Sequence, residues 1–370
     1  MKLFIETLEK EKIFAISLLL AAFTSFFVQP KLSYINFKVI LLLFNLMIII
    51  SAFEKLKIMD KIALVILDKC KNTRMVSLTF IIITFFASML VTNDVALLTF
   101  VPLSILTFKK AKVDSMKTII LQTLAANIGS SLTPMGNPQN LFLFTHYNLS
   151  GFQFFSVTIP FVALGMLWLL LLNKRVLSKK VDLSIETINI KDKKRSIMYL
   201  LLFAIVVFSI FGIIDYRYAF LTTILFIFFI DRHLIKKVDY FLLATFICFF
   251  IFIGNISNIK LIQSYLIFFL QKPNMPYVSS IILSQLVSNV PCSILVSSFT
   301  NNWKEVLLGV NIGGMGTLIA SLASVISYKI YINENEHKNK SYLYKFNVYN
   351  FISLILFAIL NYLLITLQFI

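Results

Sequence analysis

The sequence predicts an all-α polytopic membrane protein with two inverted repeats, each containing a re-entrant hairpin and a broken transmembrane helix. Three observations support this prediction. Of the 370 residues, 59% are hydrophobic and only 14% are charged, and the mean hydropathy is +0.88. Apolar runs of about 17 to 24 residues recur along the chain, which is the length that crosses a bilayer. The interruptions of these runs come in the same order in both halves of the chain.

The first half begins with two predicted spans, at 12–28 and 35–53. The N-terminus mixes glutamates with lysines and lacks a small-residue cleavage site, so the first apolar run is interpreted as a retained span. The amphipathic stretch 54–74 follows, and its alternation of apolar residues with lysines suits a helix that lies at the membrane surface.

The next apolar run, 75–108, is interrupted by the triplet Thr92, Asn93 and Asp94. A single helix of that length would measure about 51 Å, well beyond a hydrocarbon core of about 30 Å, so the chain must fold back. The arms on either side of the triplet are short for full crossings, which favours a re-entrant hairpin on the inward side. Asp94 is the acidic residue at membrane depth, where a carboxylate needs a cavity, an ion or a partner.

The segment 118–144 carries two glycines and two prolines within ten residues, in the run Asn-Ile-Gly-Ser-Ser-Leu-Thr-Pro-Met-Gly-Asn-Pro. This composition predicts a helix that is broken in the middle of the membrane. Bare backbone at that depth is tolerated only where it faces protein or a watery cavity. A span at 152–173 closes the first repeat, which we assign to residues 1–173.

The charged segment 174–196 is interpreted as a cytoplasmic linker, and 197–217 as one extra span. The second repeat, 218–370, offers the same parts in the same order. These are spans at 218–230 and 240–256, an amphipathic piece at 260–271, an outward-side hairpin at 277–299, a broken span at 305–330 and a last span at 347–369.

Matching positions in the two halves carry the same residue types. Asn93 corresponds to Asn289, and the triplet that begins at Asn127 corresponds to the one that begins at Asn311. Because one extra span separates the halves, they should have opposite orientations in the membrane. A cytoplasmic N-terminus places roughly 28 of the 34 basic residues inside, which is the bias that the positive-inside rule describes. The prediction is therefore a multi-pass protein of the cytoplasmic membrane.

The same composition argues against other kinds of partner. A net charge of +17 could indicate nucleic acid, but the basic residues fall in short loops between apolar spans. Three cysteines without metal-type spacing predict neither a disulfide framework nor a metal site. The histidines lie in loops or at segment ends and are interpreted as surface residues; they are His146, His233 and His337. No cofactor is predicted, and Na⁺ is the one candidate bound ion.

Broken helices at matching positions of two inverted repeats are typical of secondary transporters, which bind substrate and coupling ion near the midplane. Carbonyls freed by the breaks, together with Asn, Ser and Thr oxygens, suit Na⁺, while half-helix N-termini suit an anion. Asp94 could take a proton or bind a cation.

Each feature also has a purely structural interpretation. Asn93, Asp94 and Asn289 could cap the half-helices that follow, and Gly309 with Gly313 could let two helices approach closely. The prolines could mark a simple kink. These interpretations do not explain why the features recur together in both halves, and the recurrence favours a transport site.

At these residues the chain resembles the ion transporter superfamily, which includes divalent anion/sodium symporters, citrate transporters, arsenite permeases and certain sodium/proton antiporters. The resemblance rests on Thr-Asn-Asp-Val-Ala-Leu-Leu with Ala-Asn-Ile-Gly-Ser-Ser-Leu-Thr-Pro-Met-Gly-Asn-Pro-Gln-Asn. It implies that the hairpin tips hold substrate, through Thr92, Asn93, Ser288 and Asn289. It also implies ion-binding or coupling residues at Asp94, Asn127, Gly129, Thr133, Gly136, Asn311, Gly313, Gly314 and Thr317.

The chain departs from the symporter pattern at the third tip position, where threonine is replaced by Asp94 in the first half and by Val290 in the second. An aspartate there is closer to the arsenite permease pattern, and it adds negative charge where an anion would bind. The resemblance also implies a homodimer.

The sequence thus predicts a secondary active transporter, coupled to Na⁺ or H⁺, that moves a small anion: a di- or tricarboxylate such as citrate, or an inorganic anion. One alternative is a cation/proton antiporter or an arsenite-type metalloid efflux permease. Alternatives of another class are a membrane-embedded enzyme, for which no acid/base pair or metal cluster is found at depth, and a non-transporting scaffold. The predicted partners are the anion, the coupling ion and the lipid bilayer.

Overall fold

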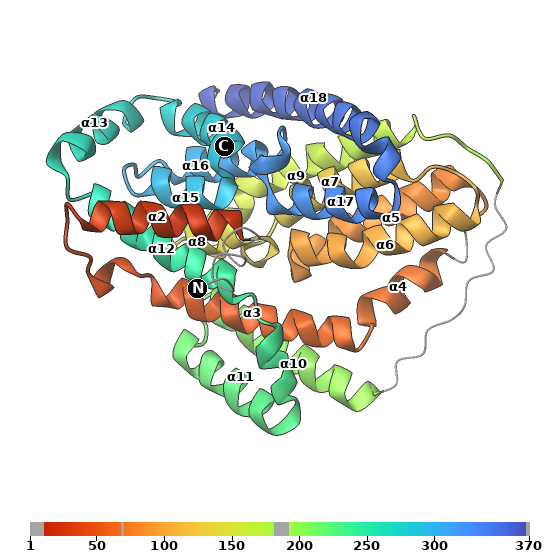
Figure 1. The fold of residues 1–370 in the computed structure, drawn as a ribbon, viewed down its shortest axis with the longest axis horizontal. Helices are drawn as coiled ribbons and strands as arrows, with labels where there is room; N and C mark the ends of the chain where they lie inside the picture. The colour runs from red at the N-terminus through yellow and green to blue at the C-terminus, as the bar shows by residue number, and fades with distance from the viewer. Residues whose placement is uncertain (1–10, 68–69, 181–191, 368–370) are drawn as a thin grey trace.

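The computed structural model describes residues 11–67, 70–180 and 192–367, which form helices joined by short turns (Figure 1). Within this part, four helices are long and apolar enough to cross a membrane, and a bent helix pair could add a fifth crossing. The four are α3 (Phe37–Lys55), α5 (Thr73–Val91), α9 (Gly151–Asn173) and α18 (Asn339–Thr366) together with the turn before it. The prediction of an all-α polytopic membrane protein is confirmed. Residues 181–191 of the predicted cytoplasmic linker lie outside the described residues.

Side chains with oxygen acceptors set where several of these helices begin. Asn36 precedes α3, and its Oδ1 accepts from the backbone N–H of Val39 at 3.2 Å. Ser150 precedes α9 and forms a reciprocal capping box with Gln153. Such caps satisfy N–H groups that have no partner within the helix, so they fix the helix start even in an apolar segment.

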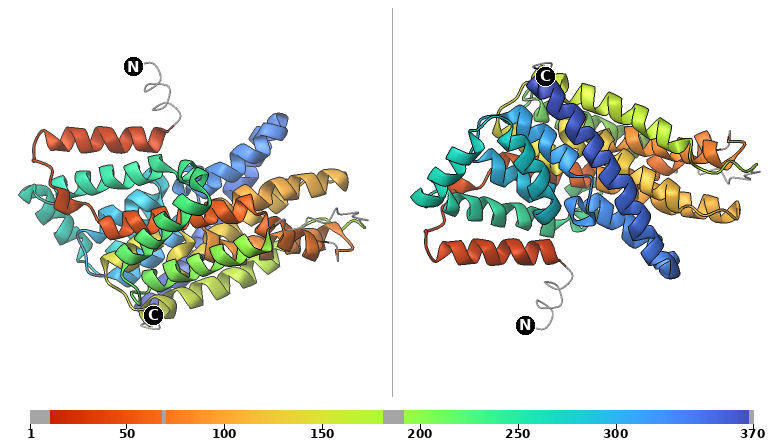
Figure 2. Two further views of the ribbon diagram at one scale, coloured as in Figure 1. Left: turned by 90° about the horizontal axis from the view of Figure 1, so that it is seen from below. Right: turned by 90° about the horizontal axis from the view of Figure 1, so that it is seen from above.

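The remaining peripheral helices lie where the sequence predicted spans or amphipathic surface helices. They are α2 (Lys12–Ser25), α4 (Ile58–Leu67), α10 (Lys193–Ile210), α11 (Tyr216–Ile230), α12 (Tyr240–Ile256) and α13 (Lys260–Leu270), with 3₁₀ turns η1 (Leu32–Tyr34), η3 (Arg232–Lys237) and η5 (Glu336–Lys338). α13 turns by 99° from α12, which suits the amphipathic helix expected there. α18 begins at Asn339, earlier than the expected 347, so the expected polar loop before it is largely helical. Figure 2 shows α18 crossing one face of the molecule.

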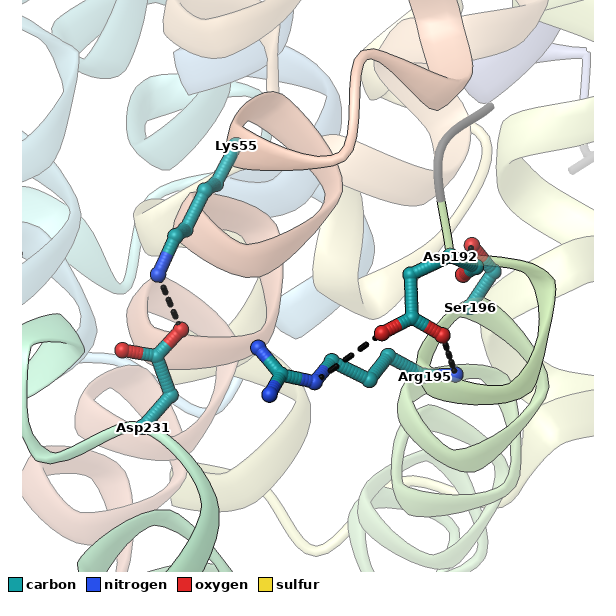
Figure 3. A network of polar contacts seen from close by, with 5 residues as sticks. All are labelled: Lys55, Asp192, Arg195, Ser196 and Asp231. Atoms are coloured by element: carbon teal, nitrogen blue, oxygen red, sulfur yellow. Dashed lines mark hydrogen bonds and ion pairs between the residues drawn. The ribbon is translucent and has the colours of Figure 1, made fainter. Parts of the chain in front are cut away.

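Two polar contacts lie on one side of the fold, one that joins α3 to the end of α11 and one within the start of α10 (Figure 3). Lys55, at the end of α3, pairs with Asp231, which follows α11. Asp192 caps α10 by accepting from the backbone N–H of Arg195 at 3.0 Å, and the two side chains also form an ion pair. Asp231 is almost fully buried, so its charge needs the lysine as a partner. The Lys55–Asp231 pair holds the second-half helix α11 against α3, and the extra helix α10 packs on α3 as well.

The interior of the fold is built from two hairpins and two broken helices. The hairpins are α5 with α6 (Asn93–Lys110), and α14 (Met275–Val287) with α15 (Asn289–Ser297). The broken helices are α7 (Met116–Ser130), η2 (Pro134–Gly136) and α8 (Pro138–His146) in the first half, and α16 (Trp303–Gly313), η4 (Leu318–Ala320) and α17 (Leu322–Glu334) in the second.

The first hairpin has longer arms than the sequence suggested. α5 contains 19 residues and α6 contains 18, because the side chain of Asn72 caps α5 two residues earlier than expected and α6 extends to Lys110. Each arm is thus about 27–29 Å long. The arms of the second hairpin contain 13 and 9 residues, and α14 begins two residues before the predicted 277. Whether the hairpins are re-entrant, and whether the repeats are inverted, stay predictions.

The packing of these parts is reciprocal between the two halves. In each half the first hairpin arm packs on the broken helix of the same half, α5 on α7 and α14 on α16. The second arm packs on the broken helices of both halves, α6 on α7 and α17, and α15 on α16 and α8. This packing brings both hairpin turns to the centre of the molecule.

Candidate substrate and ion site

The two hairpin turns have the same unusual backbone conformation. Thr92 has φ 75° and ψ 151°, and Ser288 has φ 76° and ψ 154°. L-residues rarely adopt this region, and holding one there costs about 1–3 kcal/mol. Each strained residue joins the two arms of its hairpin without any other connecting residue, so the first N–H groups of α6 and α15 are presented at the turn. Two independent turns sharing this strain indicate a functional constraint.

Both tips open into one small cavity of about 40 Å³, which we call the tip cavity. Asn93 and Asn289, the first helical residues after the turns, line it and are each only 4% exposed. Ser288 lines it as well, whereas Thr92 does not. The residues that follow the asparagines, Asp94 and Val290, also border the cavity. The structure therefore brings the predicted substrate-binding asparagines together from distant parts of the chain.

The capping interpretation of the asparagines does not hold. The N-cap positions are occupied by Thr92 and Ser288, and neither side chain caps its helix. Asn93 Oδ1 accepts from the adjacent backbone N–H of Asp94 at 3.0 Å, while its Nδ2 donates to Asn127 Oδ1 at 3.3 Å. The amide of Asn93 is therefore aimed at the broken helix rather than along its own helix.

Asn127 connects the broken helix of the first half to that of the second. Its Oδ1 accepts from Asn93 and also from Ser321 Oγ at 3.0 Å. Its Nδ2 donates to the Gly314 carbonyl at 3.2 Å and to Ser324 Oγ at 3.4 Å. A single buried amide thus contacts one hairpin tip, the opposite loop and the helix beyond that loop.

Asn311 makes the matching contacts from the second half. Its Oδ1 accepts from Ser131 Oγ at 3.0 Å and from Asn137 Nδ2 at 3.3 Å, and its Nδ2 donates to Asn140 Oδ1 at 2.7 Å. Asn137 and Ser321 occupy the same place in the two halves, the residue before the second part of the broken helix. The two broken helices are therefore joined at their breaks by reciprocal buried hydrogen bonds. Pairing these buried polar groups avoids the free-energy cost of leaving them without partners.

The predicted threonines hold each break against its own hairpin. Thr133 Oγ1 donates to the backbone carbonyl of Met89, and Thr317 Oγ1 donates to that of Gln285 at 3.2 Å. Gln285 adds two side-chain contacts that Met89 cannot make. Its Nε2 donates to the Gly313 carbonyl at 2.7 Å, and its Oε1 accepts from the Thr317 N–H at 2.9 Å. The second loop is thus more tightly bound to its hairpin than the first.

The predicted glycines allow close approach between elements. A Cβ on Gly129 would lie 2.2 Å from the Phe85 carbonyl oxygen of α5, and one on Gly313 would lie 2.7 Å from Ser284 of α14. Gly309 likewise faces α14, at Ser280. The helix-approach interpretation of Gly309 and Gly313 is therefore supported by the packing.

Two further glycines lie at the breaks themselves. A Cβ on Gly136 would lie 2.1 Å from the Ser130 carbonyl oxygen, so only glycine lets the first break fold back on the end of α7. A Cβ on Gly314 would lie 2.9 Å from Asn289 Nδ2. The missing side chain at Gly314 is what lets the second tip lie against its own broken helix.

Asp94 differs from every other tip residue in having an unsatisfied buried atom. Its Oδ1 has no hydrogen-bond partner among the described residues. The carboxylate lines the tip cavity and also a neighbouring cavity of about 210 Å³, which Thr92, Glu54, Lys237 and Asp239 line as well. We call this the Glu54 cavity. It lies on the side that the charge distribution predicts to be cytoplasmic, and it gives Asp94 a route to a proton or a cation.

The sequence interpretation missed several members of this site. Asn137 and Asn140 were part of the glycine- and proline-rich run but were not singled out, and Ser321 and Gln285 had no visible signal beyond being polar within apolar segments. The three predicted surface histidines are exposed, as expected. Whether the tip and loop residues bind substrate and ion stays a prediction.

Comparison with known proteins matches residues 4–302 to the model of a family described as citrate transporter. An uncharacterised transporter of Methanocaldococcus jannaschii is 40% identical over 300 residues, which cover 80% of this chain and 81% of that protein. The inner membrane protein YbiR of Escherichia coli is 27% identical over 98% of this chain and 97% of its own length. A Dictyostelium discoideum protein named as transporter arsB is 33% identical over 44% of this chain and 31% of its own length.

Proposed function

This chain belongs to the citrate transporter family, and we propose that it is a secondary active transporter that moves a small anion across the cytoplasmic membrane, coupled to Na⁺ or H⁺. That it is a membrane transporter follows from the family. The proposal adds the class of substrate, the coupling and the residues that carry them. The observation on which it rests is the meeting of the two strained hairpin tips in one cavity.

The tip cavity suits an anion for electrostatic reasons. The first residues of α6 and α15 both line it, and a helix N-terminus carries a partial positive charge. The amides of Asn93 and Asn289 add neutral donors, which bind a carboxylate without introducing a fixed charge. A cavity of about 40 Å³ has room for little more than one water molecule, so a substrate would have to widen it.

The coupling ion has a separate candidate position beside the anion. Asp94 Oδ1 is buried without a hydrogen-bond partner among the described residues. The neighbouring Asn93 contacts Asn127 Oδ1, an oxygen ligand of the type that suits Na⁺. A proton or cation at Asp94 would remove the charge repulsion that a bare carboxylate exerts on a bound anion. Binding of the ion and of the anion would then favour each other, which is the physical requirement of coupled transport.

Uptake of labelled citrate, succinate and sulfate into proteoliposomes tests the proposal, with an imposed Na⁺ or H⁺ gradient. Asn93→Ala and Asn289→Ala should each abolish gradient-driven uptake. Asn302→Ala is the matched control, because Asn302 is an exposed asparagine that makes no side-chain cap. Undiminished transport by the two tip variants would refute the assignment of the tips.

A second candidate function, metalloid efflux or cation/proton antiport, is favoured by Asp94 and by the acidic lining of the Glu54 cavity. The similarity to a transporter named arsB points the same way. Under this alternative, Asp94→Asn should abolish pH-dependent exchange across the liposome membrane. An anion symporter with the same substitution should retain uptake that is no longer stimulated by the ion gradient.

A further inference from the structure

A cavity of about 530 Å³ lies apart from the tips and was not indicated by any sequence motif. It is lined by the start of α3 with the turn before it, the C-terminal ends of α8, α12 and α15, and the start of α11. Its volume is in the range of small-molecule sites in proteins. We call it the Lys38 cavity, after the lysine that lines it.

The lining of the Lys38 cavity is positively charged. Among its described lining residues Lys38 is the one lysine or arginine, and none is an aspartate or glutamate. Lys38 is partly buried and lies within ion-pair distance of no carboxylate in that same part of the chain. Asp215 and Arg217, which flank the lining residue Tyr216, carry opposite charges and together add no net charge. The Glu54 cavity differs, since three carboxylates and one lysine line it.

Polar groups that can donate to an anion are held in place here. Tyr34 Oη accepts from Asn258 Nδ2 at 3.2 Å, which leaves the hydroxyl hydrogen to donate elsewhere. The Tyr34 ring packs directly on Gly254, where a Cβ would lie 2.3 Å from two ring carbons. The first turn of α3 also faces the cavity and adds the positive end of a 19-residue helix.

Two helices connect this cavity to the tip cavity. α8 has Pro138 and Gln139 in the tip cavity and His146, at its other end, in the Lys38 cavity. α15 runs in the same way from Asn289 into the Lys38 cavity. The rings of Phe142 and Phe250, which also line the Lys38 cavity, pack against each other with centroids 5.7 Å apart. The Lys38 cavity therefore lies one short helix away from the tips, on the opposite side from the Glu54 cavity.

We propose that the Lys38 cavity is a second anion-binding site, in which the Lys38 ammonium and the Tyr34 hydroxyl bind a small carboxylate on the side of the protein that faces away from the Glu54 cavity. The site recruits the anion before it reaches the tips. This last step rests on the proposed function, whereas binding in the cavity does not. The Phe142–Phe250 ring pair separates the recruited anion from the tip cavity.

Citrate binding to the purified full-length protein, measured by isothermal titration, tests the site in a background that disables the tips. In Asn93→Ala/Asn289→Ala, citrate should still bind. Adding Lys38→Gln should weaken that binding about tenfold, the loss expected for one charge-assisted hydrogen bond. Lys38→Arg should retain it, and Lys31→Gln should change nothing, because Lys31 is an exposed lysine near the cavity that does not line it.

Gly254→Ala provides a variant that leaves the charge intact. The added methyl group displaces Tyr34, so citrate should bind several-fold more weakly although Lys38 is unchanged. Equal citrate affinity in Lys38→Gln and Lys31→Gln, or no binding of citrate, succinate or sulfate in the tip-disabled background, overturns the inference. A failure of the proposed function looks different, since transport would then be unaffected by the tip substitutions while the Lys38 effect on binding persisted.

Discussion

Gly129→Ala is expected to destabilise the protein because no space exists for its methyl group. The added Cβ would lie 2.2 Å from the Phe85 carbonyl oxygen and 2.7 Å from Ser88 Oγ. Ordinary contacts between such atoms are more than about 1 Å longer than the first of these distances. Because the nearest atom belongs to the backbone of α5, no rotamer change relieves the overlap and the two helices must separate.

The magnitude follows from two opposing effects. Overpacking a well-packed contact costs about 1–3 kcal/mol, and a backbone neighbour places this case near the upper end. Alanine gains about 1 kcal/mol over glycine in a helix interior. The net loss is therefore about 2 kcal/mol. At about 2 °C per kcal/mol for a chain of this size, the midpoint of thermal unfolding should fall by about 4 °C.

The assay is size-exclusion chromatography of the detergent-solubilised protein after heating, and a graded series serves as its control. Gly313→Ala should cost less, because its closest neighbours at 2.7 Å are side-chain atoms of Ser284. Gly151→Ala should have almost no effect, because its methyl group would only meet the Phe211 ring at 3.3 Å. A midpoint for Gly129→Ala equal to that of Gly151→Ala would refute the close contact between α5 and α7.

Two further substitutions test the polar contacts. Asn127→Asp replaces the amide group that donates to the Gly314 carbonyl with a carboxylate oxygen, which can only accept. It should therefore lower both the midpoint of thermal unfolding and gradient-driven uptake into proteoliposomes, and by more than Asn127→Ser does. Burial acts to raise the pKa of the Asp114 carboxyl, but hydrogen bonds from the Met116 N–H, Lys338 and Tyr331 outweigh it and hold that pKa below its usual value. The stabilisation is therefore present above the unfolded-state pKa of about 3.9 and is lost as the pH falls through the lower folded-state value. Asp114→Asn should consequently lower the unfolding midpoint at pH 7 and at pH 5, with a difference from wild type that disappears in strong acid; a difference that does not depend on pH would contradict this account.

The sequence identified the elements of the site because each leaves a local signal. An aspartate inside an apolar run marks the first tip, and clustered glycine and proline mark the breaks. The repetition of these signals then paired Asn93 with Asn289 and Asn127 with Asn311. All four lie within the buried centre of the structure.

The contacts between these elements could not be predicted in the same way. Asn137 and Ser321 form hydrogen bonds to the opposite half only because the two broken helices meet at their breaks. A single sequence does not show where two helices meet. The packing of Gly129 on α5 depends on the same geometry. For the Lys38 cavity the obstacle is different, because its lining comes from five helices and the turn η1, which share no motif.

Because of the backbone strain at the hairpin tips, a glycine variant should be more stable there than an alanine variant, which reverses the usual order in a helix. In an ordinary helix, glycine is about 1 kcal/mol less stable than alanine, and Ser156, an exposed residue within α9, should follow that rule. At Thr92, alanine keeps the strained φ of 75° while glycine relieves it. Thr92→Gly should therefore unfold at a higher temperature than Thr92→Ala, although Ser156→Gly unfolds at a lower temperature than Ser156→Ala.

Transport separates strain from the loss of the hydroxyl group. If the strained turn positions the first N–H groups of α6, Thr92→Gly should lose more uptake than Thr92→Ala, because a relaxed glycine no longer fixes the direction of the tip. The more stable variant would then be the less active one. Equal activity of the two variants would mean that the strain has no part in binding, and the matching conformation of Ser288 would reflect the packing of the hairpins alone.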